Sequence, residues 1–511
     1  MIVEILITLV TSLIIYSIYV HKSIHYWYRK RGIKYIPGVP IFGNALNSTF
    51  RKKHFVEDID AVYKQFPDER YIGYTQGTTP IILIRDPEII KSITVKDFDH
   101  FVDRKQFISE DVEPLLGASL FLMKGDKWKD MRTTLSPAFT GSKMRLMMPF
   151  MTEISESIVE YLKDHVSEDL DVCDLMHRYT NDVIASCAFG CQVNSVKDKE
   201  NEFYRTGQSL FELSTLQRTK LILAMYFPSI AKSFGLKVFE EKDLSFFQNL
   251  VKDTMEYREK NKIERPDMIQ LLIQASNGNL NSDEADIKTE KIKREWSQQD
   301  LVAQVFIFFI AGFETSATTL ILTIHELAVN PLVQEKLYAE IKTFHDTKGK
   351  LLYDNINELK YLDCVINETL RKWSPALIMD RVCTKPYELP PPREGGKPTK
   401  LNPGDFVYNM VNSIHLDPKH YPEPDVYKPE RFSEENKHEI KPFTFMPFGI
   451  GPRTCIGTRF AMLEIKVLLY NLILNFKILK CEKTTDPIVL KPHELNIFAL
   501  GGSWVKLETR T

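Results

Sequence analysis

The sequence predicts a mainly α-helical chain with smaller β regions, an α+β fold in one large domain behind an N-terminal membrane helix. Three observations lead to this prediction. An apolar run opens the chain, helical periodicity dominates from about residue 125 to 375, and short strand-like runs lie on both sides of that region. No internal repeat or low-complexity linker divides the remainder. We therefore expect a membrane anchor at 1–21, a linker at 22–40 and one domain at 41–511.

The composition is that of a folded globular chain. Of 511 residues, 43% are hydrophobic and 26% charged, which excludes an intrinsically disordered chain. The formal net charge of -2 lacks the basic excess of a dedicated nucleic-acid-binding protein. Seven scattered cysteines form no disulfide framework and predict reduced thiols.

The first segment predicts an uncleaved membrane anchor. Residues 2–20 are apolar apart from Glu4 and small hydroxyl side chains, and a helix of this length crosses a bilayer core. The basic residues that follow predict a cytoplasmic flank, at Lys22, Arg29, Lys30 and Arg31. A cleaved signal peptide and a buried core helix are the alternatives. Pro37 and Pro40 predict a stiff linker after the basic segment.

The other elements follow from periodicity and turn signals. Residues 71–74 and 81–84 predict a β-hairpin, and helices are expected at 150–168, 173–190, 237–262, 298–330 and 331–344. Short strands and Pro-rich turns are expected at 380–450. A last helix should run from Cys455 towards Asn475, with strands in the tail. The polar run 276–293 predicts a solvated loop.

One cysteine lies in a distinctive context. The run from Phe448 to Gly457 reads Phe-Gly-Ile-Gly-Pro-Arg-Thr-Cys-Ile-Gly and places Cys455 where a glycine-rich loop meets a helix. Backbone amides at such a junction can stabilise a thiolate. A zinc site lacks a paired Cys-x2-Cys here, and a nucleophile has no base motif, although a distant base remains open. An inert cysteine would not need Gly451 and Gly457. Thiolate ligation of haem iron is the best remaining interpretation.

The helix expected at 298–330 has polar residues at its centre. An acid such as Glu314 is costly in an apolar helix unless it is functional. Gly312 followed by the hydroxyls of Thr315 and Ser316 predicts a local opening of the helix. The alternative is a satisfied Glu-Thr pair in the core.

Two further motifs place charges on single helix faces. Glu368 and Arg371 are three residues apart, and Trp128 and Arg132 are four apart. Taken alone, the first pair is typical of a surface ion pair. Arg431 follows in the run Pro-Glu-Arg-Phe.

Together the four motifs, which occur along the chain in the expected order, resemble the signatures of the cytochrome P450 monooxygenases from Pro37 to the C-terminus. The resemblance implies a single P450-type fold that binds haem b, with Cys455 as the axial iron ligand. It implies that Thr315 binds dioxygen and that Glu314 takes part in proton delivery. Other residues expected beside the haem are Trp128, Arg132, Arg453, Phe448, Gly449, Ala311 and, as a weaker propionate ligand, Arg104.

The resemblance also implies a structural triad of Glu368, Arg371 and Arg431. Some relatives hold another propionate arginine after the Glu-x-x-Arg helix, where this chain offers only Arg381. The substrate pocket is expected to include Phe107, Phe309, Ile378 and Phe498. The stretch 210–247 is expected to form a lid that touches the membrane.

No dinucleotide or flavin fingerprint is present, so an external reductase is required. The resemblance implies that the electrons come from NADPH through a separate diflavin reductase. Its docking surface is expected near Lys127, Lys129 and Lys143, with cytochrome b5 as a second partner. Trp296-Ser297 and the run from Leu135 to Thr140 resemble insect microsomal members of the family. This resemblance implies an enzyme on the cytoplasmic face of the endoplasmic reticulum that oxidises lipophilic xenobiotics. The alternatives are a hydroxylase of an endogenous hormone or fatty acid, and a non-catalytic haem sensor.

Overall fold

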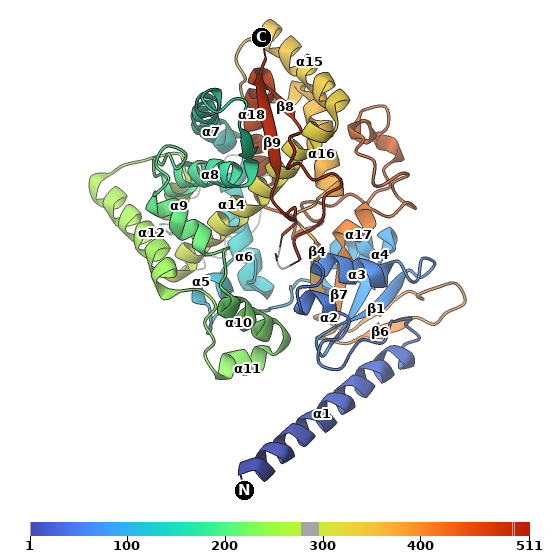
Figure 1. The fold of residues 1–511 in the computed structure, drawn as a ribbon. Helices are drawn as coiled ribbons and strands as arrows, with labels where there is room; N and C mark the ends of the chain where they lie inside the picture. The colour runs from blue at the N-terminus through green and yellow to red at the C-terminus, as the bar shows by residue number, and fades with distance from the viewer. Residues whose placement is uncertain (1, 277–295, 493, 495, 511) are drawn as a thin grey trace.

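The computed structural model describes residues 2–276, 296–492, 494 and 496–510. Figure 1 shows helix α1 (Ile2–Lys30) extending away from the body, with the N-terminus at its far end. The loop predicted at 276–293 lies, from residue 277 onward, outside the described residues.

Helix α1 continues past the expected boundary at residue 21 and ends at Lys30. Its last part is held by the N-terminal sheet. The Tyr28 hydroxyl donates to the Tyr74 carbonyl at 2.7 Å and accepts from the Ile81 amide at 3.0 Å. A Cβ atom at Gly73 would lie 2.4 Å from the Tyr28 ring, so glycine is required at that strand position. Residues 22–30, which were expected to belong to the linker, are therefore the end of α1 and pack on the first sheet.

Helices make up most of the body. Helix α14 (Gln298–Val329) runs through its middle (Figure 1) and packs on α8 (Val172–Ile184), α16 (Lys360–Lys372) and α18 (Thr458–Asn475). The other helices of at least eight residues are α3 (Phe55–Tyr63), α6 (Gly125–Leu135), α7 (Gly141–Lys163), α9 (Glu202–Ser209), α10 (Thr215–Tyr226), α12 (Glu241–Asn261), α13 (Met268–Ser276) and α15 (Pro331–Lys348). Shorter helices are α2 (Leu46–Thr49), α4 (Pro87–Lys91), α5 (Pro114–Gly117), α11 (Pro228–Ser233) and α17 (Val411–His415).

The strands form three small sheets in the described part of the chain. The first has the order β1-β2-β7-β4, from β1 (Tyr71–Gln76), β2 (Thr79–Ile84), β7 (Phe406–Met410) and β4 (Ile378–Val382). The second has the order β3-β9-β8, from β3 (Asp169–Asp171), β9 (Trp504–Thr509) and β8 (Phe476–Leu479). The third pairs β5 (Tyr387–Leu389) with β6 (Thr399–Leu401). The predicted hairpin and tail strands are confirmed.

Helix α14 begins and ends at local signals. Ser297 and Asp300 form a capping box at its start, and Pro331 opens the next helix immediately after its end. Among the helices searched in the described residues, α14 is long and apolar enough to cross a membrane, but 72% of its apolar window is buried inside the protein. It is therefore a core helix.

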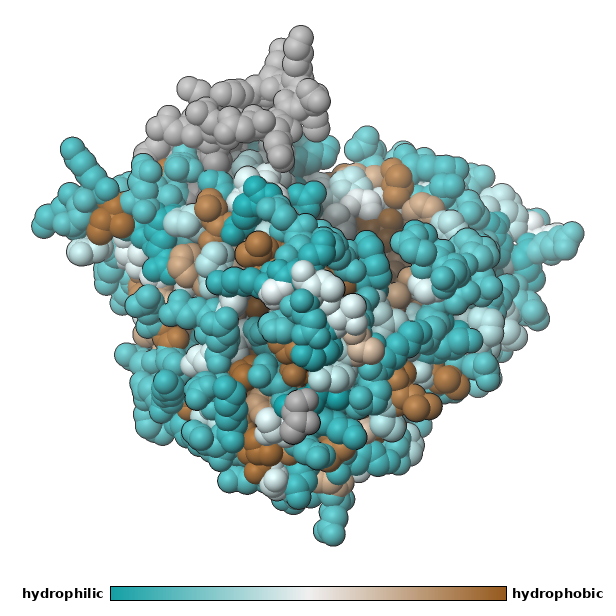
Figure 2. Space-filling model, turned by 90° about the horizontal axis from the view of Figure 1, so that it is seen from above, coloured by the Kyte–Doolittle hydropathy of each residue, from teal (hydrophilic) through white to brown (hydrophobic). Residues whose placement is uncertain are grey.

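The face of the molecule seen from above is mostly polar. Figure 2 shows it as largely hydrophilic, with scattered apolar residues.

Candidate functional site

Cys455 lies near the end of the loop that precedes α18, three residues before the helix begins at Thr458. The Cys455 amide donates to the Phe448 carbonyl at 2.7 Å, which closes the loop into a tight turn. Gly449 and Gly451 have φ of 76° and 75°, and a Cβ atom at Gly451 would lie 1.9 Å from the Thr94 carbonyl oxygen. Only glycine fits at position 451, as the sequence predicted for a tight turn.

Cys455 is accessible, yet protein atoms closely surround its thiol. Burial is the main influence on this thiol and raises the pKa of Cys455. The Gly457 amide, the Thr458 hydroxyl and the charge of Arg132 oppose this rise in pKa. A metal cation bound to the sulfur would deprotonate it outright.

Helix α14 is buried on nearly all sides but has one open face at its centre. Ala311 and Thr315, one turn apart, are exposed, whereas Phe313, Glu314 and Ser316 between and beside them are buried. The Thr315 hydroxyl donates to the Ala311 carbonyl at 2.5 Å. The prediction of a local opening is wrong, because the backbone stays α-helical through these residues and the Thr315 hydroxyl bonds to the Ala311 carbonyl without breaking the helix.

Four arginines meet near the cysteine and are called here the arginine cluster: Arg104, Arg132, Arg381 and Arg453. Arg453 stacks on Trp128, with its guanidinium carbon 3.9 Å from the ring centroid. It also donates to the backbone carbonyls of Val102 and Met123, at 3.0 and 2.7 Å. Burial and the charges of Arg104 and Arg381 lower the pKa of Arg453 to about 8.

Arg381 belongs to the same cluster, although the sequence left its role open. It is 1% exposed, its Nε has no hydrogen-bond partner among the described residues, and burial together with Arg104 lowers its pKa to about 9. Burial, together with Arg104, also lowers the pKa of Arg132, whereas the nearby Cys455 raises it.

The arginine cluster has fewer neighbouring carboxylates than guanidinium groups. The carboxylates that act on it are Asp103 and Asp380, and Arg104 contacts Asp380 at 3.7 Å. Four guanidinium groups facing two carboxylates leave two positive charges for an anionic ligand to neutralise. The two propionates of haem match this requirement, with Cys455 available to the iron. The residues present therefore fit haem.

The triad expected from the sequence forms in the core beside this site. Glu368 and Arg371 are both fully buried and make two hydrogen bonds of 2.8 Å. Arg431, in the turn η6 (Pro429–Phe432), reaches the same carboxylate at 3.4 Å.

Comparison with known proteins agrees with this geometry. Residues 34–501 match the family model described as cytochrome P450. The chain is 41% identical over 501 residues to probable cytochrome P450 9f2 of Drosophila melanogaster, covering 95% of each chain. It is 41% identical over 508 residues to cytochrome P450 9e2 of Blattella germanica, covering 95% of this chain and 94% of that protein.

The chain belongs to the cytochrome P450 family. The match confirms the family predicted from the sequence, and with it a haem-binding monooxygenase.

This P450 has a cavity of about 1010 Å³ beside α14. Phe107, Ile378 and Phe498 line it, as predicted. Phe309 does not. It is fully buried and packs on Phe203 and Phe247, because α14 is apolar all round and turns this side chain into the core.

Glu314 faces the cavity and bonds to His177, a residue of α8 that the sequence did not single out. His177 Nδ1 lies 2.7 Å from the Cys173 carbonyl oxygen, and its Nε2 lies 3.1 Å from the Glu314 carboxylate. Because a carbonyl only accepts, Nδ1 carries a hydrogen. The Nε2 contact then needs one more proton, on the ring or on Glu314. His177 and Glu314 therefore share an exchangeable proton, and Glu314 directly precedes Thr315 in α14.

The His177–Glu314 pair makes stability depend on pH. Burial opposes a charged imidazole, but the charge and hydrogen bond of Glu314 outweigh it and raise the pKa of His177 above 6.5. The stability gained is complete below the unfolded pKa and is lost as pH rises through the higher folded pKa. The free energy of unfolding of the wild type relative to His177→Gln should therefore decrease from about pH 6 upward, measured by urea denaturation at several pH values.

Two controls test this assignment. Glu314→Gln should flatten the pH dependence, whereas substitution of the exposed His438 by glutamine should leave it unchanged. A constant difference between wild type and His177→Gln at all pH values would show that no charged pair forms.

Proposed function

We propose that this P450 is a membrane-bound monooxygenase of the endoplasmic reticulum that inserts one oxygen atom of O2 into lipophilic substrates, chiefly xenobiotics. The observation that carries the proposal is the accessible but closely surrounded Cys455 beside an arginine cluster that is short of carboxylates. Haem, when bound, supplies the activation of dioxygen.

The chain's own residues would then hold the cofactor and move protons. Cys455 would ligate the iron, and the arginine cluster would bind the propionates beside Trp128. Ala311 and the cysteine-loop residues Phe448 and Gly449 would border the ring. The Thr315 hydroxyl, held on the Ala311 carbonyl, is free to turn towards a ligand on the open face. Glu314 would pass the proton that it shares with His177 to Thr315.

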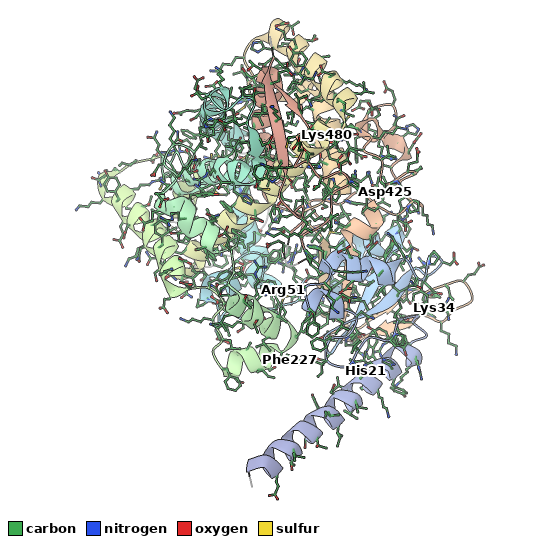
Figure 3. All side chains as sticks on the ribbon, in the orientation of Figure 1. His21, Lys34, Arg51, Phe227, Asp425 and Lys480 are labelled. Atoms are coloured by element: carbon green, nitrogen blue, oxygen red, sulfur yellow. The ribbon has the colours of Figure 1, made fainter. Side chains whose placement is uncertain are left out.

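The membrane proposal rests on two surfaces. Helix α1 exposes apolar side chains along its length, at Ile7, Ile14, Ile15, Tyr16 and Tyr19. Helices α10 and α11 expose Leu216, Ile230 and, just after α11, Phe234. Both surfaces lie on the lower side of the molecule in Figure 1, where Figure 3 labels Phe227 and His21. The basic residues after the apolar run favour a cytoplasmic body.

Electrons would come from NADPH through a diflavin reductase, with cytochrome b5 as a second donor. Lys129 is half-exposed, 3.7 Å from Asp126, and Lys143 has no ion pair among the described residues. Lys127 contacts Asp300 at 2.8 Å, so it contributes less positive charge to docking than its sequence position indicated.

A second candidate function is hydroxylation of an endogenous hormone or fatty acid. One observation favours it, an amine on the cavity wall at Lys105. A haem sensor without catalysis is the weakest candidate, because ligand binding does not require the proton that His177 and Glu314 share.

The test is reconstitution with diflavin reductase, NADPH and a panel of lipophilic substrates. The wild type should form oxygenated products. Thr315→Ala should continue to consume NADPH but divert most of the electrons to peroxide, because no hydroxyl remains on the open face to direct protons. The measurement is the ratio of peroxide and product to NADPH consumed.

Thr318→Ala is the matched control. Its buried hydroxyl donates to the Glu314 carbonyl at 2.8 Å and does not reach the open face. This variant should remain coupled. Fully coupled product formation by Thr315→Ala would contradict the role given to Thr315.

A further inference from the structure

One amine lies on the cavity wall without an acidic partner. Lys105 Nζ donates to the Gln76 Oε1 atom at 3.1 Å, and the Tyr408 hydroxyl donates to the same oxygen at 3.3 Å. All three residues line the cavity. Among the described residues, no carboxylate oxygen lies within 4.0 Å of this ammonium group.

Asp380, the acid whose charge acts on Lys105, is already bound to other groups. Asp380 accepts the Lys105 backbone amide at 2.6 Å, and its other oxygen faces Arg104 at 3.7 Å. Burial lowers the pKa of Lys105 to about 8, against the raising influence of Asp380. An ammonium group in this position has unused hydrogen-bond donors and an incompletely compensated charge.

The other partly buried cations of the cavity each have a carboxylate partner. Arg218 and Lys491 both contact Glu494, at 3.8 and 3.0 Å, and His177 contacts Glu314. Arg51 also lines the cavity but is exposed, and Figure 3 labels it near α10, where water screens its charge. Lys105 is therefore the position at which an anionic group of a substrate gains most.

Apolar side chains also line the cavity, beyond the polar residues around Lys105. Phe107 and Phe121 come from the same loop region, and Ile378 comes from the adjacent strand β4. A ligand that places a carboxylate on the amine can lay its hydrocarbon part against these side chains.

We propose that the cavity binds amphipathic carboxylic acids, with the carboxylate on Lys105 Nζ and the hydrocarbon part against Phe107 and Ile378. The inference rests on the proposed monooxygenase function and gives it a substrate class. A charge-assisted hydrogen bond should favour an acid over its uncharged ester by about tenfold or more.

The experiment uses the haem-loaded full-length protein at low salt, with dodecanoate and methyl dodecanoate as probes. Binding is measured by calorimetry and by the ligand-induced change in the haem spectrum. The wild type should bind the acid about tenfold more tightly than the ester, and Lys105→Met should remove this preference by weakening the acid alone. Lys105→Arg should retain it.

Lys491→Met is the matched control, because this cavity lysine already has Glu494 as its partner. It should leave the preference for the acid unchanged. Equal binding of acid and ester by the wild type, or an unchanged preference in Lys105→Met, would overturn the proposal. Neither result affects the proposed function, which stands if the same preparation oxygenates uncharged lipophilic substrates.

Discussion

Cys455→Ala is expected to lack the thiolate-type absorbance of the reduced, carbon-monoxide-bound protein and to lose monooxygenase turnover below detection. Alanine offers no ligand atom, and the remaining described cysteines that are buried sit in the core, such as Cys187 and Cys364. The measurement is the carbon-monoxide difference spectrum together with the haem content of the purified protein.

Two further variants separate ligation from folding. Cys455→His supplies a nitrogen ligand at the same position, so it should bind haem but show no thiolate-type absorbance. Cys481→Ala removes a half-buried thiol from the tail and should behave as the wild type. A thiolate-type absorbance that persists in Cys455→Ala would eliminate this residue as the ligand.

Local chemistry explains why the cysteine loop could be predicted from the sequence. Its turn depends on glycines at positions whose φ is positive, and its cysteine lies just before a long apolar helix that begins at Thr458. The hairpin at β1 and β2 and the limits of α14 follow from similarly local signals. These features need no knowledge of the tertiary fold.

The features that the sequence did not predict depend on packing between distant segments. Arg381 joins the arginine cluster because the Val382 amide bonds to the Asp103 carbonyl, which brings β4 against the loop that carries Arg104. His177 reaches Glu314 because α8 packs along α14. The prediction for Phe309 is wrong because a helix that is apolar on all sides does not reveal in its sequence which side faces the cavity.

The triad is connected to the cysteine loop through His415. This ring donates from Nδ1 to the Arg371 carbonyl at 3.2 Å, and its Nε2 accepts the Met446 amide at 3.0 Å. Burial and the charge of Arg371 lower the pKa of His415 to about 3, so the ring stays neutral and keeps this tautomer. Met446 stands two residues before Phe448, so a change at Arg371 reaches the loop that holds Cys455.

Arg371→Ala is expected to destabilise the protein by about 3–5 kcal/mol, because it removes the two shorter hydrogen bonds of the buried Glu368 carboxylate and leaves Arg431, at 3.4 Å, as its remaining cationic partner. The substitution also removes the bonds from Arg371 to the carbonyls of His415 and Pro424, at 2.9 and 2.8 Å. The cysteine loop should then lose its support, and haem should fail to be incorporated. The measurements are haem per protein and the free energy of unfolding in urea.

Arg205→Ala is the matched control, since its ion pair with Glu200 is exposed and such pairs contribute about 0–1 kcal/mol. It should retain full haem content. Arg371→Ala combined with Glu368→Gln should recover part of the lost stability, because the incompletely compensated charge is removed together with its main partner. A haem content equal to that of the wild type in Arg371→Ala would show that the triad does not support the cysteine loop, and the bonds through His415 would then be a packing feature only.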